Sequence, residues 1–286
     1  MKVIITGAKG RLGSKLVERF TAAGDTVTAT DLPELDLVNF WAVRAYIHDH
    51  KPDWIVHAAA WTDVDGCALE PEKATVINGH ATGNIAAAAA EIGAGVAYVS
   101  SNEVFDGCSK HPYNEYDATK PINPYGYSKW VGEQSLLRVN PRHMIIRTAW
   151  LFAHGGKNFI QSILNAAQAG KTLRVVTNEI ANPTYNDDLA EAITRLLSIG
   201  RSGTYHLINE GYCSRYAFAR YVLDRAGFAE TPLTQISATE WQRPSVPPEF
   251  APMINSAAAM LDVRLPRWQY AVDRFLSKEG LMRASS

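Results

Sequence analysis

The sequence predicts an α/β fold of the Rossmann type, with a doubly wound parallel sheet and a smaller C-terminal α/β substrate lobe. Short β-branched runs alternate with longer helical stretches through the first half of the chain, which is the pattern of successive βαβ units. A glycine-rich loop follows the first of these runs and leads into the first helical stretch. The 286 residues suffice for one large or two modest domains with a substantial core.

The first half contains the elements of a dinucleotide-binding domain, which we expect over residues 1–150. Strands are expected at 3–6, 26–30, 54–57, 96–100 and 144–148, where β-branched and aromatic residues gather. Helices are expected between them at 11–23, 40–48, 71–92 and 125–139, where apolar residues recur at helical spacing. Parallel strands joined by helices bury both faces of the sheet.

The pattern loosens in the second half, and we expect a smaller substrate-binding lobe over residues 151–286. Helices are expected at 158–169, 187–198 and 215–226, strands at 173–177 and 204–208, and a proline-rich segment at 243–252. No long flexible linker separates the halves, so some segments of the second should return to pack on the first. A cleft between the two parts is the expected ligand site.

Composition excludes several classes of protein. The formal net charge is −1 and the lysines and arginines are dispersed, so no basic surface for nucleic acid is indicated. Cys67, Cys108 and Cys213 are far apart and form no CxxC pair, which favours neither disulfides nor a metal site. No signal peptide or membrane span is evident. We expect a cytoplasmic protein without membrane partners, either a monomer or a homodimer.

The loop from Gly7 to Gly13 has glycines at the spacing GxxGxxG between the first strand and the first helix. Glycines there permit a tight turn and let the backbone approach a pyrophosphate at the helix N-terminus. Gly7, Gly10, Arg11 and Leu12 are therefore candidate cofactor-binding residues.

The second strand ends at Asp31, the position of an acid that binds the adenosine ribose hydroxyls. This acid favours NAD, because it would repel the 2′-phosphate of NADP. Lys9 and Arg11 in the loop offset that repulsion, so the choice between NADH and NADPH stays open. The third strand leads into Ala58, Ala59 and Ala60, whose small side chains suit either a flat ring or close helix packing.

Tyr125 and Lys129 lie four residues apart at the start of a predicted helix, so they share one face. A neighbouring cation favours a phenolate, which suits Tyr125 as a general acid with Lys129 lowering its pKa. The fourth strand ends at Ser101, whose hydroxyl is placed to bind a substrate carbonyl at the carboxyl edge of the sheet. The three residues form a candidate catalytic set.

These residues together resemble the extended short-chain dehydrogenase/reductase superfamily. Five further blocks are similar to those of the dTDP-4-dehydrorhamnose reductase family, namely AAAWTDVD at 58–65, VFDG at 104–107, NPYGYSK at 123–129, RTAW at 147–150 and NPT at 182–184. The resemblance runs from the N-terminus to about residue 208 and returns near 243–244 and 265–268. It implies that hydride from NAD(P)H reduces the C4 keto group of a dTDP-6-deoxysugar, with Tyr125 donating the proton.

The resemblance also implies further site residues. Asp36 and Leu37 match the pair near the adenine, and Thr62, Val64 and Trp150 match positions that line the cofactor or the sugar. Trp150 is equally consistent with a core aromatic at the end of a strand. Arg243 suits a pyrophosphate clamp, because a guanidinium matches phosphate oxygens, although a surface position suits it as well.

The chain departs from the family at Ser101, Asn102 and Glu103, where the family usually has Thr-Asp-Tyr. Serine keeps the hydroxyl, whereas Asn102 cannot act as an acid, which disfavours the dehydration chemistry of related Thr-Asp-Glu enzymes. Asn102 and Glu103 remain candidate substrate-binding residues, and the exact sugar stays open.

Two alternatives share these motifs. One is a nucleotide-sugar epimerase or dehydratase that holds NAD tightly, and the other is a catalytically silent nucleotide-binding regulatory homologue. A silent protein needs no catalytic set, yet Ser101, Tyr125 and Lys129 are all present.

Overall fold

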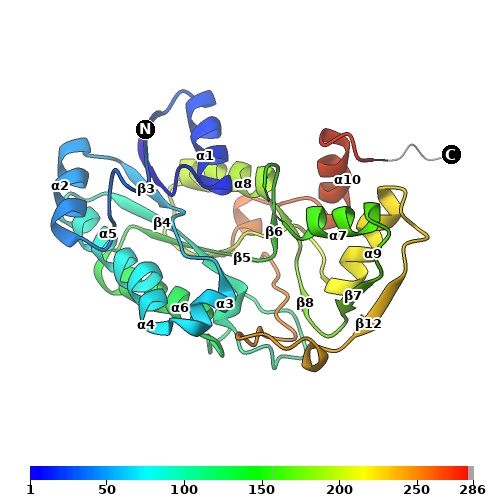
Figure 1. Ribbon diagram of the computed structural model, residues 1–286. Coiled ribbons are helices and arrows are strands. Elements are labelled where there is room, and N and C mark those ends of the chain that lie inside the picture. Colours follow the sequence, from blue (N-terminus) through cyan, green and yellow to red (C-terminus); the bar gives the residue numbers. More distant parts are fainter. Residues whose placement is uncertain (157, 283–286) are drawn as a thin grey trace.

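A six-stranded parallel sheet forms the centre of the computed structural model, which describes residues 1–156 and 158–282 (Figure 1). The strand order is β10-β5-β4-β3-β1-β2, and every pairing within it is parallel. The strands are β1 (Lys2–Thr6), β2 (Thr26–Thr30), β3 (Trp54–His57), β4 (Gly95–Ser101), β5 (His143–Thr148) and β10 (Gly203–His206). The predicted parallel α/β fold is confirmed.

Helices cover both faces of this sheet (Figure 1). On one side lie α1 (Arg11–Ala22) and α8 (Asn186–Ile199), which contact each other. On the other lie α2 (Phe40–His50), α5 (Ala81–Glu91) and α6 (Pro124–Val139). Burial on both faces explains why the strands are almost continuously apolar.

The alternation of side chains along β1 explains how one strand serves two cores. Val3 and Ile5 point into the cluster that contains Leu16 of α1. Ile4 points to the opposite cluster with Val43 of α2. Successive strand residues face opposite sides of a sheet, so both helical layers are anchored on this strand.

A second group of elements lies beyond the carboxyl side of the sheet. Its helices are α7 (Phe159–Gln168), α9 (Arg215–Arg225) and α10 (Trp268–Lys278). Three two-stranded sheets accompany them: β6 (Leu151–Phe152) with β9 (Thr184–Tyr185), β7 (Leu173–Val176) with β12 (Leu233–Ile236), and β8 (Ile180–Ala181) with β11 (Cys213–Ser214). An aromatic-rich core around Phe152, Phe218 and Phe275 holds these helices together.

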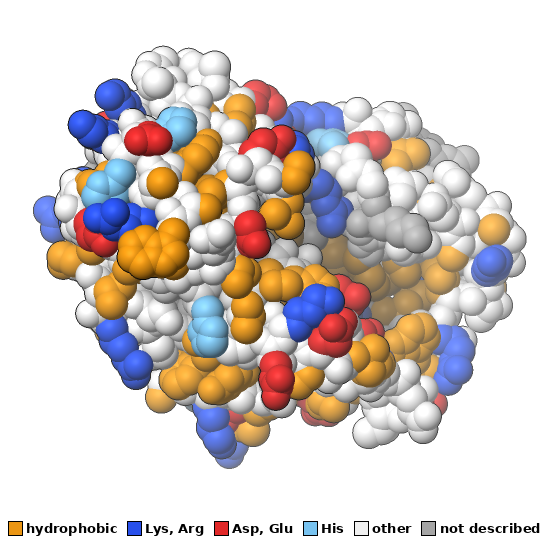
Figure 2. Space-filling view, turned by 60° about the vertical axis from the view of Figure 1, so that its left-hand side comes forward, with side chains coloured by type: hydrophobic (Ala, Val, Ile, Leu, Met, Phe, Trp, Pro, Cys, Tyr) orange, Lys and Arg blue, Asp and Glu red, His pale blue; other side chains and the backbone are white. Residues whose placement is uncertain are grey.

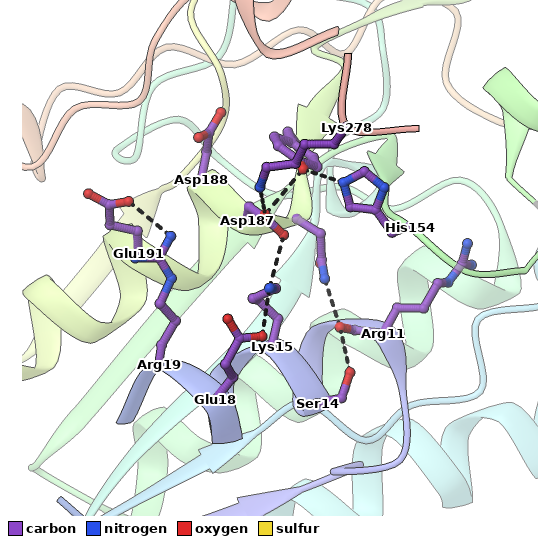
Figure 3. A network of polar contacts seen from close by, with 12 residues as sticks. Arg11, Ser14, Lys15, Glu18, Arg19, His154, Asp187, Asp188, Glu191 and Lys278 are labelled. Carbon is purple, nitrogen blue, oxygen red and sulfur yellow. Dashed lines mark hydrogen bonds and ion pairs between the residues drawn. The ribbon is translucent and has the colours of Figure 1, made fainter. Parts of the chain in front are cut away.

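Segments of the second half return to the first. α8 packs on α1, and β10 pairs with β5 at the edge of the main sheet. Asp187 of α8 also lies 3.8 Å from Lys15 of α1 and 2.8 Å from Lys278 of α10 (Figure 3). Charged contacts of α8 therefore join the first and last helices of the chain.

The prediction of a single continuous helix at 71–92 is wrong. The segment is broken into α4 (Pro71–Ala74), a π-helical turn η1 (Thr75–His80) and α5, after the short α3 (Val64–Leu69). Asn78, within the π turn, uses both ends of its carboxamide to bond the backbone of Trp61. A π-helical turn contains an extra residue, which changes the direction of the side chains that follow. The periodicity of apolar residues does not predict the contact between Asn78 and Trp61.

Within the described ranges, no helix combines the length and the apolar character required to cross a bilayer.

Candidate active site

A cavity of about 690 Å³ lies at the carboxyl ends of the first strands. Eight of the residues predicted to bind the cofactor line it: Gly7, Gly10, Asp31, Asp36, Leu37, Ala58, Ala59 and Ala60. The volume and the glycine-lined wall fit a dinucleotide, which in open α/β sheets binds outside the carboxyl edge.

Gly7 shows why this wall must lack a side chain. Its φ is +69°, a conformation that L-residues rarely adopt, and an added Cβ would lie 2.6 Å from the backbone nitrogen of Ala59. The glycine loop and the end of β3 are therefore in direct contact, and the N-terminus of α1 faces the cavity floor. Backbone N–H groups at that helix end are suited to phosphate oxygens.

Asp31 is held in place on the wall of the cavity. Its carboxylate accepts hydrogen bonds from the backbone N–H of Lys9 at 3.0 Å and of Leu32 at 2.9 Å. The ammonium of Lys9 is bonded to Glu34 at 2.9 Å and to the carbonyl of Leu32 at 3.1 Å. Glu34 thus balances the charge of Lys9, one of the two residues, with Arg11, that were expected to offset Asp31.

We expect NADH to bind more tightly than NADPH, because Asp31 would repel a 2′-phosphate. Asp31→Ser should tighten NADPH binding relative to NADH by about tenfold, roughly 1.4 kcal/mol. Fluorescence titration of both cofactors measures this without turnover. Asp49→Ser, which removes an exposed carboxylate outside the cavity lining, is the matched control. Unchanged relative affinity in the Asp31 variant would contradict the assignment.

Tyr125 lies in the first turn of α6, which Asn123 caps by accepting the N–H of Gly126 at 2.8 Å. Burial raises the pKa of the Tyr125 phenol above its ordinary value, and the negative charge of Glu103 adds to that effect. A hydrogen bond with Ser101 acts in the opposite direction. The sequence analysis expected Lys129 to lower this pKa, but burial and Glu103 raise it instead. A high pKa keeps the phenol protonated, as a general acid requires.

Lys129 lies one turn after Tyr125 and is only 2 % exposed. Its ammonium lies 4.2 Å from the centre of the Tyr98 ring. Burial lowers the pKa of Lys129 to about 7, partly opposed by the carboxylate of Glu133. Glu133 is itself held by Arg147 at 2.7 Å and by the Ser100 hydroxyl at 2.6 Å.

Asn78 is a site residue that sequence reasoning missed. Its amide donates to the carbonyl of Trp61 at 3.0 Å and to the Ser128 hydroxyl at 2.9 Å, so it connects the loop after β3 to the catalytic helix. The Ser128 hydroxyl donates in turn to the carbonyl of Tyr125 at 2.7 Å. A lone asparagine in an apolar helix was the available signal.

Arg215, at the start of α9, was also missed, and it brings the second half of the chain to the site. Its guanidinium lies 3.7 Å from the ring centre of Trp150 and 3.3 Å from Glu179. Trp150 has a φ of +41°, a strained conformation that clusters at functional sites. Trp150 also packs against two hydrophobic clusters, as expected of a core aromatic, and its role in lining the sugar stays a prediction.

Arg243 is the first residue of the proline-rich segment and contacts α3. Its Nε donates to Asp65 of α3 at 2.9 Å, and the Ser245 N–H donates to the same oxygen at 3.1 Å. The side chain is partly exposed. Figure 2 shows one face of the molecule hollowed, with hydrophobic side chains on the floor and charges of both signs at the rim.

Five other predicted residues lie at positions that contact the expected ligand site less directly than expected. Leu12 packs in the core beside β1, and Arg11 is the exposed first residue of α1. Thr62 is exposed and is not part of the 690 Å³ cavity wall. The amide of Asn102 donates to the Ala251 carbonyl at 3.2 Å and so anchors the proline-rich segment. Val64 is the partly buried first residue of α3.

The arrangement suits reduction of a carbonyl group. A reduced nicotinamide, when bound, supplies a hydride. Ser101 and Tyr125 together offer two hydroxyls to one carbonyl oxygen, and Tyr125 holds the proton that an alkoxide would take. The buried cation of Lys129 favours the build-up of negative charge nearby.

Comparison with known proteins gives a consistent result. The family described as RmlD substrate binding domain matches residues 1–280. A spore coat polysaccharide biosynthesis protein, SpsK, from Bacillus subtilis is 35 % identical over 279 residues, covering 98 % of each chain.

Two solved structures are also similar. A dTDP-4-dehydrorhamnose reductase from Clostridium acetobutylicum has a TM-score of 0.93 and 31 % identity, covering 98 % of this chain and 100 % of its own. A dTDP-4-dehydrorhamnose reductase from Bacillus anthracis in complex with NADP has a TM-score of 0.91 and 31 % identity, covering 97 % and 99 %.

Proposed function

This chain belongs to the RmlD substrate binding domain family, and from that premise we propose that it reduces the C4 keto group of a dTDP-linked 6-deoxysugar with NADPH or NADH. The product is a deoxysugar precursor of a polysaccharide. The observation that carries the proposal is the juxtaposition of Tyr125 with Ser101, which ends β4, while Lys129 is buried one turn behind Tyr125. The glycine-lined cavity lies at the carboxyl ends of β1 and β3 in the same sheet.

In this proposal Ser101 orients the keto oxygen, Tyr125 protonates it and Lys129 supports the developing charge. Gly7, Gly10 and Asp31 hold the cofactor in the 690 Å³ cavity. Trp150 lines the sugar site.

Arg243 supports the recognition of the diphosphate, because a partly exposed guanidinium bonded at one edge keeps other N–H groups for phosphate oxygens. We also propose a cytoplasmic location, which the free cysteines Cys67, Cys108 and Cys213 support, and a monomeric or homodimeric state.

The proposed function predicts that the protein oxidises one NADH or NADPH for each dTDP-4-keto-6-deoxysugar that it reduces. The loss of reduced-nicotinamide absorbance and the appearance of the 4-hydroxy sugar are both measured. Sugar interconversion without net consumption would instead identify an epimerase that retains its NAD. Cofactor binding without any sugar turnover would identify a silent homologue.

A further inference from the structure

Glu103 occupies a fixed place beside the proposed catalytic residues. Its backbone N–H donates to the Ser101 hydroxyl at 3.2 Å. Its carbonyl lies so near Gly126 that a Cβ there would be 2.0 Å away, which leaves no room for movement against the catalytic helix. The backbone of Glu103 is therefore held between Ser101 on one side and Gly126, the residue after Tyr125, on the other.

The two carboxylate oxygens of Glu103 are used differently. Oε2 accepts a hydrogen bond from the side-chain amide of Asn123 at 2.7 Å. For Oε1, the residues at 1–156 and 158–282 supply no hydrogen-bond donor. An ionised carboxylate can only accept hydrogen bonds, so Oε1 presents an acceptor.

Positive charges from the second half of the chain act on this carboxylate. Burial raises the pKa of Glu103, whereas Asn123, Arg215 and Arg243 act to lower it. Arg215 is itself stacked on Trp150. Glu103 also raises the pKa of Tyr125, which places its charge within electrostatic reach of the phenol. The carboxylate thus belongs to the same site as the proton donor.

We propose that Glu103 determines sugar specificity, with Oε1 accepting a hydrogen bond from a hydroxyl or amino group on the ring carbon next to the keto carbon. This inference rests on the proposed function, in which Ser101 and Tyr125 bind the C4 keto oxygen. Of the two neighbouring carbons, C5 bears the methyl group of a 6-deoxysugar, so the donor is at C3. Glu103 is two residues after Ser101 and its charge acts on Tyr125, so its side chain is next to both groups that bind the keto oxygen in the proposed function.

The specificity test uses 4-keto nucleotide sugars matched at every position except C3. Wild-type kcat/KM should be about 10- to 100-fold higher for the 3-hydroxy or 3-amino sugar than for the 3-deoxy or 3-O-methyl sugar, as for a hydrogen bond to a charged group. Comparing the 3-hydroxy with the 3-amino sugar identifies which donor the site takes.

Glu103→Met removes the acceptor and should reduce this preference to within about threefold. Glu230→Met is the matched control, since it makes the same chemical change at an exposed glutamate that does not act on Glu103, and it should leave the preference intact. A role of Glu103 in folding alone would lower turnover of all sugars equally. An unchanged preference in Glu103→Met, or no preference in the wild type, would overturn the proposal.

Calorimetry separates this proposal from the proposed function. Binding of non-reacting 4-hydroxy nucleotide sugars with and without the C3 hydroxyl requires no turnover. The wild type should bind the 3-hydroxy ligand about 10-fold or more tightly than the 3-deoxy ligand, and Glu103→Met should bind both alike. If no keto sugar is reduced, the proposed function fails, while this comparison still decides the role of Glu103.

Discussion

Tyr125→Phe should lower kcat for the keto sugar by about 10³-fold, within the 10²- to 10⁴-fold range of general acid catalysis. The substitution removes only the phenolic oxygen, which is hydrogen-bonded to Ser101 and is held protonated by burial and by the charge of Glu103. The ring volume and the packing of α6 are retained. Single-turnover measurement of cofactor oxidation reports this step directly.

The Tyr125 variant should bind NADH as the wild type does, because the glycine-lined cavity is untouched. Tyr127→Phe provides a matched control: the same chemical change two residues away, on a side chain that is 48 % exposed. It should retain wild-type kcat. Equal loss in both variants, or turnover by Tyr125→Phe within tenfold of wild type, would contradict the role of Tyr125.

Lys129→Met should abolish most activity and yet stabilise the protein below neutral pH. Lys129 has an ordinary pKa of 10.5 that burial lowers to about 7. Below pH 7 the ammonium is charged in both the folded and the unfolded chain, so the folded chain bears the full cost of burying it. The pKa difference sets an upper limit of about 5 kcal/mol for that cost.

This cost decreases as the pH rises from about 7 toward 10.5, because the folded protein loses the proton first. At pH 6 the free energy of unfolding of Lys129→Met, obtained from denaturant titration, should therefore exceed that of the wild type by about 1–4 kcal/mol. The advantage should shrink by pH 10. Turnover at pH 7 should fall about 10²-fold, since the buried cation is gone.

Lys110→Met is the control for the stability experiment, because Lys110 is exposed and its replacement should change stability by no more than about 0.5 kcal/mol. Equal midpoints for wild type and Lys129→Met at pH 6 would show that the buried ammonium carries no cost. Retained activity in that variant would show that Tyr125 acts without it.

Local signals in the sequence determined most of the sheet. Each of the five strands expected in the first half lies within two residues of its observed bounds. Their apolar runs are long enough to be buried on both faces, and the intervening helices have their own periodicity. The glycine loop was equally readable, because the φ of +69° at Gly7 and its contact with Ala59 demand a residue without a side chain.

The sequence by itself also determined the Tyr125 and Lys129 pair, since residues four apart on a helix share a face whatever the rest of the chain does. Only the tertiary structure decided the electrostatic state of that pair. Burial raises one pKa and lowers the other, and the extent of burial depends on elements distant in the chain. Arg215 reaches Trp150 across 65 positions and Glu34 reaches Lys9 across 25, contacts that no local periodicity encodes. Short-range sequence patterns thus determined the fold and the reacting groups. The charged groups around them are brought close only by contacts that form in the folded chain.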